Sequence, residues 1–134
     1  MTRKEAREIM MQILYEMDAS GELEPDRAVL LAEQKLPGNH KERGSRLLVR
    51  IIEDIENIDD MINRASSHWK TSRMPKVDLA IMRLACGEMC FDDDIPDAIA
   101  VNEAIDIGKK YSTERSARFI HGVLGAVSQE RNKK

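Results

Sequence analysis

The sequence predicts an all-α protein, and three observations support this prediction. Apolar residues recur at spacings of three and four along most of the chain, which is the period of a helix with one buried face. The chain has only four prolines and seven glycines in 134 residues. Charged residues make up 34% of it and are spread throughout, as on exposed helix faces. We expect about seven helices in two small packed bundles, residues 1–70 and 71–134, that share one core as a single domain.

The first helix is predicted to begin almost at the N-terminus. Thr2 and Glu5 have the spacing of a capping box, and Gly21 is a suitable end. Three bases fall in its first two turns: Arg3, Lys4 and Arg7. The helix dipole disfavours cations there, whereas a bound phosphate would pair with them and with free backbone N–H groups. The bases therefore form either a solvated tip or an anion site.

A second helix is predicted from Pro25 to about Leu36, and the Pro-Gly-Asn run at 37–39 ends it. A long helical pattern follows from about His40, and we expect a break near residues 57–59, where Asn and Asp favour caps over helix interiors. Three arginines share one face of this segment: Arg43, Arg46 and Arg50. They either extend a basic surface or belong to a salt-bridged exposed face.

A linker containing Trp69 and residues 72–75 joins this half to the next, whose first helix is predicted to begin at Pro75. Glu88 lies among apolar residues and thiols on that helix, so we expect it to be partly buried and paired. Cys86 and Cys90 are four residues apart. They could form a disulfide or a metal pair, but no further cysteine completes a site, so small core thiols are favoured.

The last two helices are predicted on either side of a turn at Ser112 and Thr113, either of which can cap the second. Gly108 and Gly122 each cost about 1 kcal/mol relative to alanine inside a helix. Their presence in neighbouring helices indicates either a close approach of two backbones or two tolerated glycines.

Charge is distributed unevenly, although the net charge is only −3. Residues 84–108 contain seven acidic residues and no Lys or Arg, whereas residues 109–134 contain seven bases and two acids. Four of these bases surround the last interhelical turn, beside two aromatic residues: Lys109, Lys110, Arg115 and Arg118, with Tyr111 and Phe119. Cations that hold phosphates and rings that stack on bases are typical of single-stranded RNA binding. The alternative is that both rings belong to the core.

Catalytic signatures are missing from the sequence. The three histidines lack metal-ligand spacing, there is no phosphate-binding glycine loop and no Gly-x-Ser-x-Gly elbow, and the acids at 92–94 lack the spacing of an EF-hand. We therefore expect no enzyme, no cofactor and no metal. With no run of eighteen apolar residues and no signal-peptide pattern, we expect a cytoplasmic protein without a membrane partner.

A series of short motifs, in order along nearly the whole chain, resembles the NusB family. They are Ala6-Arg-Glu8, Gln12-Ile-Leu-Tyr15, Trp69, Arg73-Met74, Asp78-Leu-Ala-Ile-Met-Arg83, Asp94-Ile-Pro96, Val101-Asn-Glu-Ala104, Lys109-Lys-Tyr-Ser112 and Ser116 with Phe119-Ile-His-Gly-Val-Leu124. The members of that family are all-helical bacterial transcription antitermination factors that bind the boxA element of ribosomal RNA leaders.

The resemblance implies two binding surfaces. It implies RNA-binding roles for Arg3, Lys4, Arg7, Lys110, Arg115, Arg118 and Phe119. It also implies a contact with NusE, a ribosomal protein of the small subunit, through Tyr15, Asp78 and Arg83. The acidic stretch suits a basic ribosomal protein electrostatically.

The resemblance therefore implies a non-enzymatic factor that binds boxA-like single-stranded RNA with NusE, within the antitermination complex of RNA polymerase. The alternative is a protein-interaction module on the same scaffold with weak or no RNA binding. A third reading is a domain of the kind that precedes ribosomal RNA cytosine methyltransferases. A homodimer is also an expectation, since some family members dimerise.

Overall fold

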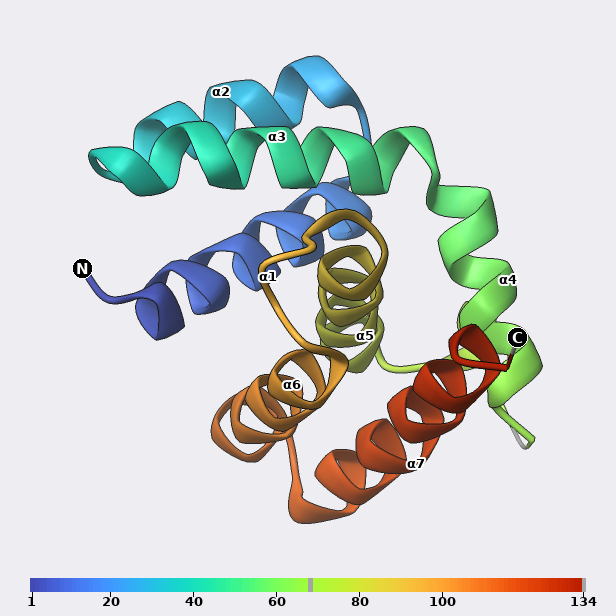
Figure 1. The fold of residues 1–134 in the computed structure, drawn as a ribbon. Helices are drawn as coiled ribbons and strands as arrows, with labels where there is room; N and C mark the ends of the chain where they lie inside the picture. The colour runs from blue at the N-terminus through green and yellow to red at the C-terminus, as the bar shows by residue number, and fades with distance from the viewer. Residues whose placement is uncertain (68, 134) are drawn as a thin grey trace.

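The computed structural model describes residues 1–67 and 69–133, and within these ranges the chain is helical, with no strand (Figure 1). The helices are α1 (Arg3–Ser20), α2 (Pro25–Lys35), α3 (Asn39–Glu53), α4 (Ile55–Ala65), the 3-10 turn η1 (Thr71–Arg73), α5 (Lys76–Phe91), α6 (Asp97–Tyr111) and α7 (Glu114–Arg131). The predicted fold class and the expected seven helices are confirmed within these ranges.

The helix ends follow the local signals in the sequence. The Thr2 hydroxyl accepts a hydrogen bond from the Glu5 amide at 3.1 Å, and the Glu5 carboxylate accepts one from the Thr2 amide at 3.0 Å, which completes the predicted capping box. Gly21 ends α1 in the left-handed conformation at φ 72°. Thr113 caps α7 by accepting a hydrogen bond from the Ser116 amide at 2.9 Å.

The break in the long helical segment lies elsewhere than predicted. It falls at Asp54, between α3 and α4, rather than at residues 57–59. Asp54 is the N-cap residue of α4, but its side chain makes no capping hydrogen bond to the backbone and instead accepts one from the Asn57 side chain at 2.7 Å. The predicted position was wrong because Asn57 lies within the first turn of α4 rather than between the two helices. At this break α4 turns sharply away from α3 (Figure 1).

Helix α5 lies at the centre of the fold, and α1, α3, α4, α6 and α7 all contact it (Figure 1). Every residue from Asp78 to Met89 is buried. The buried apolar residues of both predicted halves form one cluster, from Ala6 on α1 to Val127 on α7. The halves therefore share a continuous core around a single helix.

Packing of α6 on α7 explains one of the two interhelical glycines. A methyl group at Gly108 would lie 3.2 Å from the Cδ1 atom of Ile120 and 3.5 Å from the Cα atom of Ala117, so the close approach predicted there is confirmed. A methyl group at Gly122 would meet no atom within 4 Å, so packing does not require that glycine.

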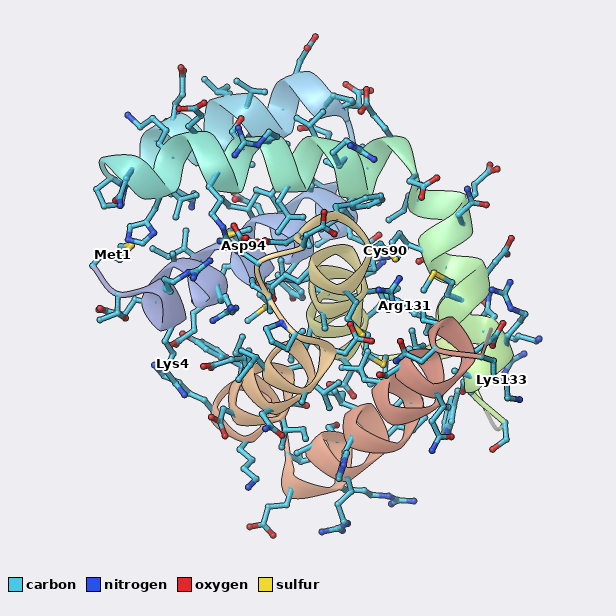
Figure 2. All side chains as sticks on the ribbon, viewed as in Figure 1. Met1, Lys4, Cys90, Asp94, Arg131 and Lys133 are labelled. Carbon is cyan, nitrogen blue, oxygen red and sulfur yellow. The ribbon has the colours of Figure 1, made fainter. Side chains whose placement is uncertain are left out.

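The last turn of α7 is attached to the end of α5. Arg131 donates a hydrogen bond to the carbonyl of Met89 at 2.6 Å, and its Nε atom lies 3.6 Å from a carboxylate oxygen of Asp97. Its Nη1 atom lies 3.6 Å from the thiol of Cys90, and Figure 2 shows these two side chains together. Both Cys86 and Cys90 are free thiols, as favoured, and burial raises the pKa of each.

The described residues offer neither a membrane span nor a metal-binding cluster. No helix among them combines the length and the apolar character needed to cross a lipid bilayer. No three or more His, Cys, Asp or Glu side chains in residues 1–67 and 69–133 come together in a way that could hold a metal ion.

Candidate nucleic-acid interface

The bases at the start of α1 differ in their surroundings. Arg3 is exposed and makes no ion pair with the described residues. Lys4 is exposed too, but its Nζ atom lies 2.9 Å from a carboxylate oxygen of Asp106 and 3.5 Å from one of Glu103. The hydrogen bond to Asp106 raises the pKa of Lys4. Lys4 thus reaches from α1 towards α6 (Figure 2).

Arg7 is 5% exposed and lies inside the protein. Its Nε atom donates a hydrogen bond to Glu88 at 2.8 Å, and its Nη1 atom lies 3.8 Å from Glu103. Arg43 of α3 lies 3.8 Å from the same oxygen of Glu88 and also pairs with Asp92. Burial raises the pKa of Glu88, and the two guanidinium groups oppose this shift. Glu88 is buried and paired as predicted, whereas Arg7 does not lie on the expected basic surface.

The α6–α7 turn is bound to α1 through one carboxylate. Glu8 accepts hydrogen bonds from Lys110 Nζ at 2.6 Å and from the Tyr111 hydroxyl at 2.7 Å. Gln12, one turn further along α1, donates to the Tyr111 hydroxyl at 3.2 Å. The hydrogen bond from Lys110 lowers the pKa of Glu8, while Glu8 raises the pKa of both Lys110 and Tyr111. Contacts between residues about one hundred positions apart therefore bring the two predicted basic segments together.

Arg115 and Arg118, at the start of α7, are exposed and make no ion pair with the described residues. They are three residues apart on a helix and can share one face. Phe119 is half-buried and packs against the core. It is therefore neither a fully exposed ring for stacking on bases nor a fully buried core residue. Tyr111 is exposed and is fixed by its hydrogen bond to Glu8.

Beside Arg115 lies a hollow of about 320 Å³, the Trp69 hollow, between the linker and the start of α7. Its lining includes Trp69, Arg73, Asp78, Arg115 and Phe119. Trp69 is 50% exposed, although its side chain is the largest apolar one in the sequence. From the sequence, Trp69 and Arg73 were placed in the linker and among the family motifs, but neither was given a binding role. The signal that could have found them is a tryptophan next to bases in a segment without helical periodicity.

The residues expected to contact NusE are mostly internal. Tyr15 is 40% exposed, but Asp78 is 2% exposed and accepts a hydrogen bond from the Ser112 hydroxyl at 2.9 Å. Arg83 is buried and donates to both carboxylate oxygens of Asp59, at 2.9 and 2.7 Å. Its Nη1 atom also lies 3.4 Å from Asp18, at the end of α1. Arg83 therefore joins α1, α4 and α5, and Tyr15 is the exposed member of the three.

Two of the three arginines of α3 make ion pairs, which agrees with the prediction of a salt-bridged exposed face. Arg43 pairs with Asp92 and Glu88, and Arg46 lies 3.5 Å from Glu42 on the same helix. The guanidinium of Arg50 instead lies over the ring of Phe91, 4.4 Å from its centre.

The fold and these surfaces define an all-helical protein with a basic, aromatic-bearing face at one interhelical turn. The chain belongs to the NusB family, whose model matches residues 4–129.

Relatives named transcription antitermination protein NusB match nearly the whole chain. The protein from a Thermoanaerobacter species is 44% identical over 132 residues, which is 97% of this chain and 92% of the relative. The protein from Acetivibrio thermocellus is 41% identical over 128 residues, or 95% of this chain and 88% of the relative.

Solved structures show the same fold. NusB of T. maritima superposes with a TM-score of 0.86 at 32% identity, covering 97% of this chain and 92% of that one. A chain in a structure of the antitermination factors NusB and NusE in complex with double-stranded RNA gives a TM-score of 0.82 at 28% identity, with 96% of each chain covered.

Proposed function

We propose that this chain is a transcription antitermination factor that binds boxA-like single-stranded RNA of ribosomal RNA leader transcripts together with NusE. It would act in the cytoplasm, within the antitermination complex of RNA polymerase, and without a catalytic step. Family membership supports the proposal, as do the relatives named for antitermination and the solved complex of NusB, NusE and RNA.

The observation that carries the proposal is the joining of the two basic segments through Glu8. The Lys110 and Tyr111 side chains both bind this carboxylate of α1. Because of these contacts, the first turns of α1 lie beside the end of α6, from which the chain turns into α7. A strand of RNA could follow a surface formed by these segments, with its phosphates on bases from both.

Within this surface the bases have different availability. Three arginines make no ion pair with the described residues and can therefore bind phosphates directly: Arg3, Arg115 and Arg118. Lys4 and Lys110 would exchange an internal carboxylate for a phosphate. Arg7 would support the surface from beneath, since it binds Glu88 in the interior. Phe119 would offer the exposed part of its ring to a base.

For NusE, we propose that Tyr15 lies in the contact surface, with Asp78 and Arg83 fixing the helices around it. The acidic residues between Glu88 and Asp106 would attract a basic ribosomal protein. Two proteins that each touch the same RNA act as linked sites, so NusE should raise the affinity of the chain for RNA.

The test is the double variant Arg115→Ala/Arg118→Ala, measured by titration of labelled boxA RNA at several salt concentrations. Each phosphate contact on a single strand contributes a slope of roughly 0.7 in log affinity against log salt. Loss of both contacts should weaken binding and flatten the slope by about 1.4. The free energy of unfolding should change by less than about 0.5 kcal/mol, because both side chains are exposed.

The matched control is Arg27→Ala/Arg46→Ala, which removes two arginines from α2 and α3, away from the α6–α7 turn (Figure 1). It should leave the slope unchanged. A folded Arg115→Ala/Arg118→Ala protein with the wild-type slope would remove this turn from the RNA site. Binding of NusE without any binding of RNA would favour the protein-interaction module instead.

A further inference from the structure

We propose that the Trp69 hollow receives one unstacked base of the RNA, and that Asp78 selects a base with an exocyclic amino group, such as cytosine. This inference rests on the proposed function and deepens it. It assigns roles to Trp69 and Arg73, and it gives Asp78 a role in reading a base.

Aromatic surface is the first reason. Trp69 and Phe119 line the same hollow from two different segments of the chain, the linker and α7. An indole that is half exposed in the free protein leaves ring surface available for stacking. Bases in single-stranded RNA are splayed out and stack on such rings, whatever their identity.

The linker that carries Trp69 is already fixed. The Thr71 amide donates a hydrogen bond to the Asn63 side chain of α4 at 2.8 Å, and the Trp69 amide donates to the Ser66 hydroxyl at 3.2 Å. Met74, just after η1, is buried in the core. Because the amides of Trp69 and Thr71 are both hydrogen-bonded to residues at the end of α4, little ordering of these two residues is left to occur when a base binds.

The charges of the hollow suit a nucleotide. Arg73 and Arg115 both line it, both are exposed, and neither makes an ion pair with the described residues. Their guanidinium groups can bind the phosphates on either side of a stacked base. They also offset the repulsion between those phosphates and the carboxylate of Asp78.

Asp78 provides the selectivity. Its Oδ1 atom accepts the hydrogen bond from Ser112, whereas Oδ2 accepts no hydrogen bond from residues 1–67 or 69–133. An ionised carboxylate can only accept hydrogen bonds. The N4 amino group of cytosine is a donor, whereas uracil has a carbonyl oxygen at the same position. The carboxylate therefore favours cytosine over uracil.

The chain itself supplies the reporter, because Trp69 is its only tryptophan. We would follow the fluorescence of the wild-type protein during titration with short homopolymers of cytidine and of uridine. Saturable quenching is expected with both. The cytidine oligomer should reach half-saturation at a concentration at least roughly fivefold lower than the uridine oligomer. A hydrogen-bonded contact that reads a base discriminates by about 1 kcal/mol or more.

Two variants separate stacking from selection. Trp69→Ala should weaken binding of a labelled cytidine oligomer by roughly 5- to 150-fold, which is the range for the loss of one stacked ring. Trp69→Phe should restore most of it. Asp78→Asn should remove the preference for cytidine, and thermal unfolding checks that each variant is folded.

The possible failures can be told apart. If labelled boxA RNA binds but the fluorescence of Trp69 does not change, the base pocket is wrong and the proposed function stands. If NusE alone changes the fluorescence and RNA does not, the hollow is a protein-binding site and the inference is overturned. Equal midpoints for cytidine and uridine would overturn the role of Asp78. If no RNA binds with or without NusE, both proposals fail.

Discussion

The start of α1 and the start of α7 carry the same sequence feature, bases within the first two turns of a helix, but the surroundings of those bases differ. At α1, Lys4 and Arg7 are held by carboxylates from α5 and α6. At α7, Arg115 and Arg118 make no ion pair with the described residues. A base near a helix N-terminus is therefore not evidence of an anion site until the acids around it are known.

The difference also decides what each region can add to RNA binding. A phosphate that binds Arg118 displaces only solvent and counterions, so the full salt dependence appears. A phosphate that binds Lys4 must compete with Asp106, which lies 2.9 Å away. We expect α7 to supply most of the salt-dependent affinity and α1 to supply most of the structural support.

The largest effect should come from Arg7→Met. This change leaves the buried carboxylate of Glu88 without its nearest partner, and breaking a buried pair in this way costs about 3–5 kcal/mol. The free energy of unfolding from urea titration should fall by that amount. The double change Arg7→Met/Glu88→Met should recover much of the loss, since neither charge is then left alone.

Lys4→Met, one turn earlier on α1, is the matched control, and its effect on stability should be below about 1 kcal/mol because the pair it breaks is exposed. An Arg7→Met protein that is as stable as the wild type but no longer binds RNA would contradict the proposed difference between the bases of α1 and those of α7. Arg7 would then be a contact residue.

A middle-sized effect is expected at the junction of the two regions. Glu8→Gln keeps the shape of the side chain but removes the charge that binds Lys110. Hydrogen bonds to a charged group contribute about 1.5–3 kcal/mol, and solvent screening at the exposed Lys110 reduces the loss below that range. The variant should be less stable than the wild type at neutral pH.

The pH dependence tests the cause of that loss. Because the pKa of Glu8 is lowered from its ordinary value near 4.5, the stabilisation is present above that value and disappears as the pH falls through the lowered pKa. The difference between wild type and Glu8→Gln should therefore vanish in strong acid. A difference that stays constant down to about pH 3 would contradict the role of the charge.

The smallest effect should come from Asp106→Asn. This change frees Lys4 from its closer carboxylate and removes one negative charge from the RNA surface. Because exposed pairs contribute about 0.2–1 kcal/mol, we expect RNA to bind about 1.4- to 5-fold more tightly. Labelled RNA titrated at fixed salt measures this. Weaker binding would show that Asp106 supports the surface rather than competing with the RNA.

Local signals in the sequence were enough for much of the fold. The capping box at Thr2, the helix end at Gly21 and the cap at Thr113 depend on residues within one turn of each other. Helical periodicity predicted the buried faces of the helices because it too depends on residues three and four positions apart. The break was predicted at the wrong place because several Asn and Asp residues between 54 and 60 carry the same local signal, which does not decide among them.

The candidate sites were harder to predict because their partners are distant in the chain. Glu88 lies 81 residues from Arg7, and Glu8 lies 102 residues from Lys110. No local pattern links these pairs. The Trp69 hollow was missed for a related reason, because its walls come from a linker and a helix that meet only in the folded chain.

The attachment of Arg131 to the end of α5 has a practical consequence for labelling the protein. Cutting α7 before this residue would leave the Met89 carbonyl without its donor, whereas Asn132 and Lys133 beyond it are exposed. The eighteen residues of α7 rise by about 1.5 Å each, so its two ends lie roughly 25 Å apart. A dye, an affinity tag or a surface attachment placed after Lys133 should therefore leave Arg115, Arg118 and the Trp69 hollow open to ligand.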